Sequence, residues 1–215
     1  FIAQLTHELR TPLAIAVGSL RRASLRSTEI PSNSAEHMQV ASQELKRMAR
    51  LIDHLTLLTD IDTGSQRWSV RSVSVADILV LWLEQISDQA RQRLVVSVNE
   101  NLSQVIFDVD PEALIVVLNN LLDNSLRYSP EDSPVVLLVE EKSECVRFFI
   151  ADWGYGIPQN LLEHVFDRFR RLEEHRDPSR ADGSGLGLAV SRSLLGLMNG
   201  QISFLPHDSV GIPDS

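Results

Sequence analysis

The chain has 215 residues, 43% hydrophobic and 23% charged, a composition that fits a folded globular protein and excludes a disordered or collagen-like chain. Its 20 lysine and arginine residues against 29 aspartate and glutamate residues leave a formal net charge of −9, which argues against sequence-independent nucleic-acid binding. The single cysteine, Cys145, excludes an internal disulfide, and its apolar neighbours predict a small buried side chain.

No apolar run approaches the roughly 20 residues that span a bilayer, and no signal peptide is visible. The sequence begins at Phe1, within a helical pattern and without Met, so we expect a fragment of a longer protein. Any membrane segment would then belong to a part of that protein that this sequence does not contain.

Residues 1–62 are predicted to form two amphipathic helices, because apolar residues recur at about 3.5-residue spacing. Pro12 is expected to kink the first helix near residue 8, and the segment 26–34 has the composition of a turn. A hairpin alone leaves apolar surface exposed, so we expect it to dimerise into a four-helix bundle. The apolar positions are Ile2, Leu5, Leu9, Leu13, Ala16, Leu20 and Ala23, then Ala41, Leu45, Met48, Ile52 and Leu55.

A break around Gly64 divides the chain into residues 1–64 and 65–215. The second part mixes alternating and helical patterns, which predicts an α/β sandwich and an α+β fold for the whole chain. Asp110 and Pro111 are a typical helix start. The expected helices are 75–91, 111–128 and 186–198, and the expected strands are 69–75, 94–98, 105–108, 135–140, 145–151 and 201–205.

Three groups of polar or glycine residues stand out. His7 lies two residues from Leu5 and from Leu9, so it is predicted to face away from the apolar stripe, with Thr11 one turn further on the same face. By itself, a surface histidine of this kind is most often only solvated. The neighbouring Glu8 adds a carboxylate.

The second group is Asn120, Asn124 and Arg127, whose i, i+4, i+7 spacing places them on one helical face. Such a face is either solvated or holds a ligand, and amide oxygens suit Mg²⁺. Thirdly, five of the ten glycines lie between residues 154 and 187, where backbone can approach a phosphate or can simply form a flexible loop. The run is neither a dinucleotide-binding fingerprint nor a Walker A loop.

Together these groups resemble the sequence motifs of sensor histidine kinases, in the family's order. Residues 5–13 resemble the H-box and residues 119–129 the N-box. Residues 152–156 and 183–188 resemble the two glycine boxes, and residues 166–171 resemble the F-box of the ATP lid. The chain is identified as similar to the cytoplasmic core of such a kinase, in which a phosphoacceptor hairpin precedes an ATP-binding domain of the gyrase and chaperone type.

The resemblance implies that His7 attacks the γ-phosphate of ATP, that Glu8 orients its imidazole, and that Thr11 positions water for dephosphorylation of a partner. It implies adenine recognition by Asp152 and Mg²⁺ held by Asn124 with help from Asn120. The residues that it assigns to the nucleotide are Asn120, Asn124, Arg127, Tyr128, Asp152, Gly154, Gly156, Ile157, Arg168, Arg171, Gly183, Ser184, Gly185, Leu186, Gly187 and Leu188.

The family depends on ATP and Mg²⁺, and its expected partners are a second copy of the chain and a response-regulator receiver domain, with no nucleic acid. The chain would be the cytoplasmic portion of an inner-membrane sensor, attached to the membrane only through segments outside this sequence. Two alternatives remain: a degenerate kinase that acts as a dimeric binding module, and an ATPase without a phosphoacceptor. Trp153 and Tyr155 depart from the usual glycine box and either stack on the base or pack the lid.

Overall fold

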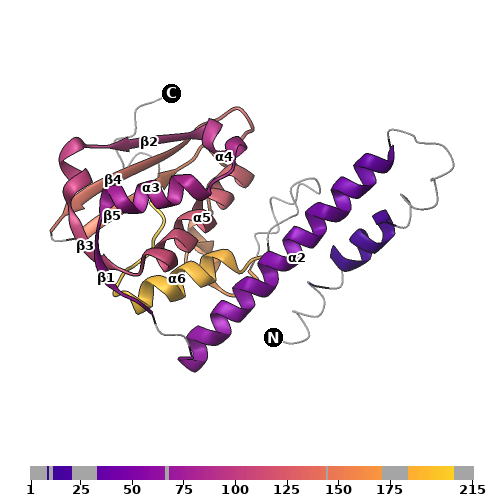
Figure 1. Ribbon diagram of the computed structural model, residues 1–215, viewed down its shortest axis with the longest axis horizontal. Helices are drawn as coiled ribbons and strands as arrows, with labels where there is room; N and C mark the ends of the chain where they lie inside the picture. Colours follow the sequence, from indigo (N-terminus) through magenta and orange to yellow (C-terminus); the bar gives the residue numbers. More distant parts are fainter. Residues whose placement is uncertain are drawn as a thin grey trace.

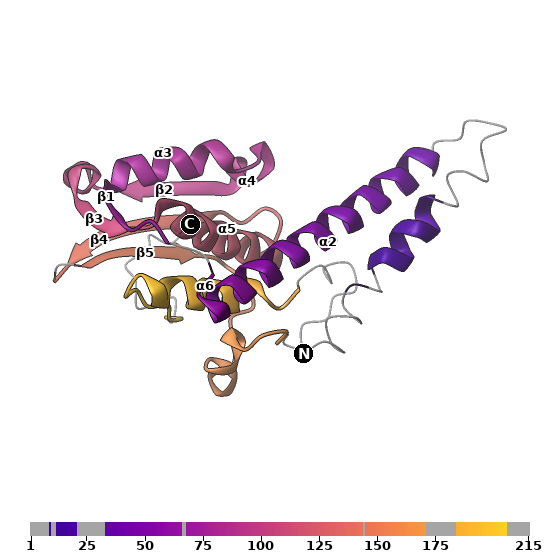
Figure 2. The ribbon, with the colours of Figure 1, turned by 60° about the horizontal axis from the view of Figure 1, so that its bottom comes forward.

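The computed structural model describes residues 9, 12–20, 33–65, 68–143, 145–170 and 184–205. A helix over residues 12–20 and the long helix α2 (Asn33–Thr63) run side by side and project from the rest of the molecule (Figures 1 and 2). The predicted pair of helices is thus confirmed in its described parts, while the expected kink near residue 8 lies outside them. α2 ends where Gly64 takes a φ of +64°, a left-handed conformation that commonly follows the last helical residue.

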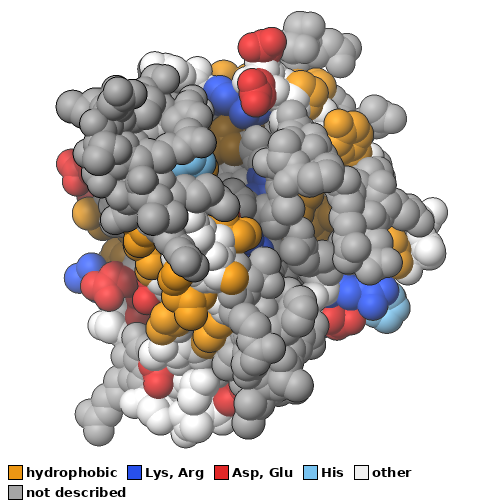
Figure 3. Space-filling model, turned by 90° about the vertical axis from the view of Figure 1, so that its right-hand side faces the viewer, with side chains coloured by type: hydrophobic (Ala, Val, Ile, Leu, Met, Phe, Trp, Pro, Cys, Tyr) orange, Lys and Arg blue, Asp and Glu red, His pale blue; other side chains and the backbone are white. Residues whose placement is uncertain are grey.

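The hairpin leaves much of its predicted apolar stripe open. Ala16 is buried, whereas Leu13, Leu20, Leu45 and Ile52 are between 47% and 50% exposed in the single chain. Figure 3 faces the hairpin side of the molecule and shows hydrophobic side chains gathered there. This is the arrangement expected of a helix pair that completes its core against another helical surface.

In its described residues, the second region contains two sheets with helices in front of the strands (Figure 1). In the three-stranded sheet, β4 is central, with β2 parallel on one side and β5 antiparallel on the other. β1 and β3 form a separate antiparallel pair. The strands are β1 (Arg71–Ser74), β2 (Leu94–Val98), β3 (Ile106–Val109), β4 (Val135–Lys142) and β5 (Cys145–Ala151), and the helices are α3 (Val75–Gln85), α4 (Asp88–Arg93), α5 (Pro111–Tyr128) and α6 (Gly187–Leu197).

Helix α5 is the centre of the core and has the bounds that the sequence predicts. Asp110 caps it: one carboxylate oxygen accepts from the N–H of Ala113 at 3.1 Å, and the other accepts from the N–H of Ser69 at 2.7 Å. One cap therefore both starts the helix and anchors the segment that leads into β1. The buried residues of α5 are Pro111, Ala113, Leu114, Ile115, Val117, Leu118, Leu122 and Ser125.

The prediction of one continuous helix over residues 75–91 is wrong. The helix is interrupted after Gln85, and a short second helix, α4, starts at Asp88. The reason is local: the Ser87 hydroxyl accepts from the N–H of Ala90 at 3.2 Å and caps α4 while the Ser87 backbone is extended.

Two further expectations are corrected. Residues 201–205 form no strand, and Phe204 instead packs its ring against Phe166 at 5.4 Å between centroids. Cys145 is exposed rather than buried, because it is the first residue of β5, where the strand pairs with Lys142 beside the hairpin turn. An apolar neighbourhood in sequence does not bury a residue at the end of a hairpin.

Candidate functional site

One large cavity brings most of the predicted nucleotide residues together. It is lined by residues of α2, β3, α5, β5, the loop after β5, the start of α6 and the segment 198–205. The predicted residues that line it are Asn120, Asn124, Arg127, Tyr128, Asp152, Gly154, Gly156, Ile157, Ser184, Gly185, Gly187 and Leu188. Leu186 does not line it, because its side chain is fully buried in the core.

Asp152 is held rigidly at this cavity. One carboxylate oxygen accepts from the N–H of Gly154 at 2.8 Å, and the other accepts from the hydroxyl of Ser125 at 2.9 Å. A Cβ on Gly154 would lie 2.8 Å from the Asp152 carboxylate and 3.1 Å from the carbonyl oxygen of Tyr128, so only glycine fits. The carboxylate retains free lone pairs and can accept a further hydrogen bond from a ligand.

The sequence analysis does not identify Ser125 as a site residue, although its position on α5 indicates that its hydroxyl is buried. It lies one residue after Asn124, so it points toward the buried side of the same helix. A hydroxyl on a buried helical face needs a partner, and the Asp152 carboxylate supplies one.

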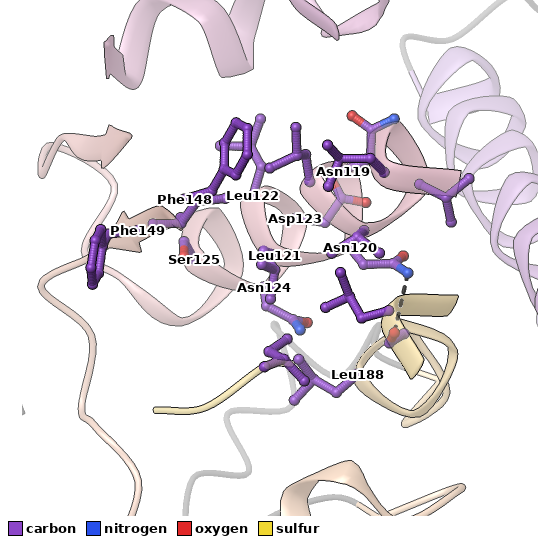
Figure 4. A pocket seen from close by; sticks show the side chains of 18 of the residues that line it. Asn119, Asn120, Leu121, Leu122, Asp123, Asn124, Ser125, Phe148, Phe149 and Leu188 are labelled. Atoms are coloured by element: carbon purple, nitrogen blue, oxygen red, sulfur yellow. Dashed lines mark hydrogen bonds between the residues drawn. The ribbon is translucent and has the colours of Figure 1, made fainter. Parts of the chain in front are cut away.

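The two predicted amides have different environments (Figure 4). The side-chain nitrogen of Asn120 donates to the carbonyl of Gly187 at 3.1 Å and to the hydroxyl of Ser191 at 3.3 Å, which ties α5 to the start of α6. Asn124 projects from α5 toward Leu188. Asn120 is therefore placed to position the glycine segment, and Asn124 is the better placed of the two to contact a ligand.

The second glycine box is packed tightly against the F-box. The N–H of Phe169 donates to the carbonyl of Gly185 at 2.8 Å. Gly185 has a φ of +67°, and a Cβ there would lie 2.9 Å from the carbonyl oxygen of Arg170. Phe169 itself has a φ of +62°, which is strained for a residue with a side chain. A backbone hydrogen bond and a close backbone contact thus join the two motifs.

Arg168 does not line the cavity. Its guanidinium donates to both carboxylate oxygens of Asp62 on α2, each at 2.8 Å. Hydrogen bonding to Arg168 holds the pKa of the Asp62 carboxyl below its ordinary value and raises that of the guanidinium. Arg170, which the sequence reasoning passed over, lines the cavity instead. The F-box contains three arginines, Arg168, Arg170 and Arg171. The sequence alone does not show which of them lines the cavity, because that depends on the backbone direction of the turn.

A second contact joins α2 to α5. His54 of α2 faces Asn120, and Arg50 of the same helix approaches Asp123 at 3.4 Å. Burial lowers the pKa of the His54 imidazole, and the nearby Asn120 side chain opposes that effect only in part. The hairpin helix thus contacts the helix that carries the amides.

The remaining predicted site residues, His7, Glu8, Thr11, Arg171 and Gly183, lie outside the described residues.

Within the described part, no cluster of three or more histidine, cysteine or acidic side chains is arranged to hold a metal. None of the helices described is both long and apolar enough for a membrane span.

Comparisons with known proteins agree with this architecture. Residues 1–64 match the family model of the His Kinase A (phospho-acceptor) domain. Residues 109–212 match that of the histidine kinase-, DNA gyrase B-, and HSP90-like ATPase. The sensor histidine kinase WalK of Bacillus subtilis is 28% identical over 204 residues, which cover 94% of this chain and 33% of WalK. The chain thus spans about a third of the length of this curated relative.

Solved structures show the same fold. The histidine kinase AdeS of Acinetobacter baumannii has a TM-score of 0.70 at 22% identity, over 94% of this chain and 91% of that one. The histidine kinase ThkA, solved in complex with response regulator protein TrrA, has a TM-score of 0.67 at 20% identity, over 93% of this chain and 55% of that one.

Proposed function

We propose that this chain, which belongs to the histidine kinase family, is a two-component kinase core that phosphorylates itself on His7 and passes the phosphate to an aspartate of a response regulator. The observation that carries the proposal is the fixed Asp152 carboxylate in a cavity that also collects Asn124, Arg127 and the glycine segment at the start of α6. A matched phosphoacceptor hairpin precedes that cavity in the chain.

ATP is proposed to bind with its adenine amine donating to Asp152 and its phosphates toward the N-terminus of α6, where free backbone N–H groups favour anions. Arg127 and Arg170 line the cavity and carry positive charge toward that region, and Arg171 is assigned there by the motif. A magnesium ion bound with the nucleotide would offset phosphate charge, with Asn124 as its amide ligand. The contacts of Asn120 favour positioning over direct ligation.

In the proposed reaction, a neutral imidazole nitrogen of His7 forms a bond to the γ-phosphorus while the bond to the β–γ bridging oxygen breaks and ADP leaves. Glu8 holds the other ring nitrogen in the required orientation. Positioning and charge supply most of the rate enhancement in phosphoryl transfer. A receiver aspartate then takes the phosphate, and Thr11 is proposed to orient water when the phosphorylated partner is hydrolysed.

The proposed assembly is a homodimer through the hairpin, supported by the exposed stripe that includes Leu45 and Ile52. The receiver domain of a response regulator is the proposed partner, by analogy with the ThkA complex. We also assign the chain to the cytoplasmic part of a sensor whose membrane attachment lies in other segments.

The test is incubation of the chain with labelled ATP and Mg²⁺. We expect acid-labile phosphate on the parent chain and on the control His37→Gln, and none on His7→Gln, which should still bind ATP. Label retained in His7→Gln would contradict the assignment. ATP binding without any phosphoprotein would indicate the binding module, and phosphate release without a phosphoprotein would indicate an ATPase.

A further inference from the structure

The last turn of α2 presents negative charge to the ATP-binding region. It contains Asp60 and Asp62 and has no basic residue of its own. A helix C-terminus already carries partial negative charge, so acidic residues there attract a cation from elsewhere. Arg168 provides that cation from a segment 106 residues further along the chain.

The geometry of this pair is specific. Both end nitrogens of the guanidinium donate to the two oxygens of one carboxylate at 2.8 Å, the planar arrangement in which arginine binds carboxylates and phosphates alike. The Asp62 and Arg168 side chains are 52% and 36% exposed, so the pair is weak enough to exchange for another anion. A nucleotide phosphate is such an anion.

The pair also acts on the backbone of the glycine segment. Arg168 directly precedes Phe169, whose strained conformation and hydrogen bond to Gly185 hold the F-box against the second glycine box. The backbone of Phe169 and Arg170 approaches Gly185 so closely that there is no space for a side chain at that glycine.

We propose that Asp62 is a positioning residue that holds Arg168 outside the nucleotide cavity and competes with the nucleotide phosphates for it. The Arg168 guanidinium can pair either with Asp62 or with a nucleotide phosphate. The contact between α2 and the ATP-binding region therefore weakens nucleotide binding, and nucleotide binding weakens that contact. This inference rests on the proposed nucleotide site and adds a residue of the hairpin to its control.

The test is a double-mutant cycle on the full 215-residue chain, with affinity for the Mg²⁺ complex of the ATP analogue AMPPNP measured by calorimetry. Asp62→Asn keeps the side-chain shape and removes the charge. We expect it to tighten binding about threefold, the size typical of exposed ion pairs, and to lose this effect in an Arg168→Gln background. Asp62→Glu keeps the carboxylate, so its affinity for AMPPNP should equal that of the parent.

Asp60→Asn is the matched control, because it removes a charge from the same turn without touching the pair. It should leave the affinity close to that of the parent. An equal gain in Asp60→Asn would point to the general field of the helix end and overturn the proposal. So would an effect of Asp62→Asn that persists in the Arg168→Gln background, or no effect at all.

The two proposals fail in different ways. A parent chain that does not bind AMPPNP would remove the proposed function and this inference with it. A parent chain that binds AMPPNP, with no coupling in the cycle, would remove only the role of Asp62. Thermal melting of each variant, followed by circular dichroism, confirms that the compared chains are folded.

Discussion

Helices α2 and α5 are both long and amphipathic, yet they complete their apolar contacts differently. Leu118 of α5 is 1% exposed within the single chain, whereas Leu45 and Ile52 of α2 are each 50% exposed. The polar face of α5 lies in a cavity, and the polar residues of α2 contact α5 and the F-box. α5 is therefore enclosed within one folding unit. α2 has two faces, one that contacts the ATP-binding region and one apolar face that is exposed in the single chain.

The largest expected effect tests the open surface of α2. Leu45→Glu would place one charge from each copy into the core of the proposed dimer, which we expect to weaken association by about 5 kcal/mol, enough to leave monomers. Light scattering gives the mass. The control Gln43→Glu adds the same charge at a neighbouring exposed position and should stay dimeric. An unchanged dimer in Leu45→Glu would show that another surface forms the interface.

A second effect tests the enclosed face of α5. Leu118→Ala should lower the free energy of unfolding by about 3 kcal/mol, because it leaves a cavity among buried neighbours. Denaturant titration measures this change. Leu81→Ala on α3, at a side chain that is 40% exposed, should lower the same free energy by less than about 1 kcal/mol. Similar losses at both positions would contradict the placement of Leu118.

The third prediction concerns the cavity beside α5. Asp152→Asn should weaken nucleotide binding by about 2 kcal/mol, since it replaces a charged acceptor that two donors already orient. Calorimetry with AMPPNP measures the change. Asp77→Asn is the control, because this exposed carboxylate accepts from the Ser74 hydroxyl at the start of α3, away from the cavity, and the variant should bind nucleotide normally. Equal affinity in Asp152→Asn and the parent would refute the adenine assignment.

The smallest effect concerns the contact between the two helices. His54 has a folded-state pKa below its ordinary value of 6.5, so the unfolded chain binds more protons as the pH falls through that value. The contribution of a neutral His54 is therefore present above about pH 6.5 and is lost progressively below it. Asn120 and Asp123 face the imidazole from α5, and Asp53 and Arg50 are its charged neighbours on α2.

We expect the melting temperature to fall between pH 7.5 and pH 5.5, and to fall less in His54→Gln, which stays neutral. The difference should correspond to less than about 1 kcal/mol, because nearby Asp53 and Asp123 partly compensate the proton. His37→Gln, on the same helix, is the control and should keep the dependence of the parent. Identical pH dependence in His54→Gln and the parent would exclude His54 as its source.

The sequence by itself determined the elements whose signals are local. α5 has its predicted bounds because Asp110 and Pro111 start it, and because Ser129 precedes Pro130, which disfavours further helix. The hairpin of β4 and β5 follows from two apolar runs separated by a polar turn. The motif residues around Asn124, Asp152 and Gly187 were predicted from their resemblance to the sequence boxes of sensor histidine kinases, and they line one cavity of the structure.

Only the tertiary structure decided which side chain of a motif faces which neighbour. Whether Arg168 or Arg170 enters the cavity depends on the left-handed turn at Phe169 and on Asp62, a residue 106 positions away. The Asn120 side chain donates a hydrogen bond to the Gly187 carbonyl only because α6 packs on α5. Contacts of this kind join segments that are distant in sequence, so no periodicity or local propensity encodes them, and packing of the folded chain selects among chemically equivalent candidates.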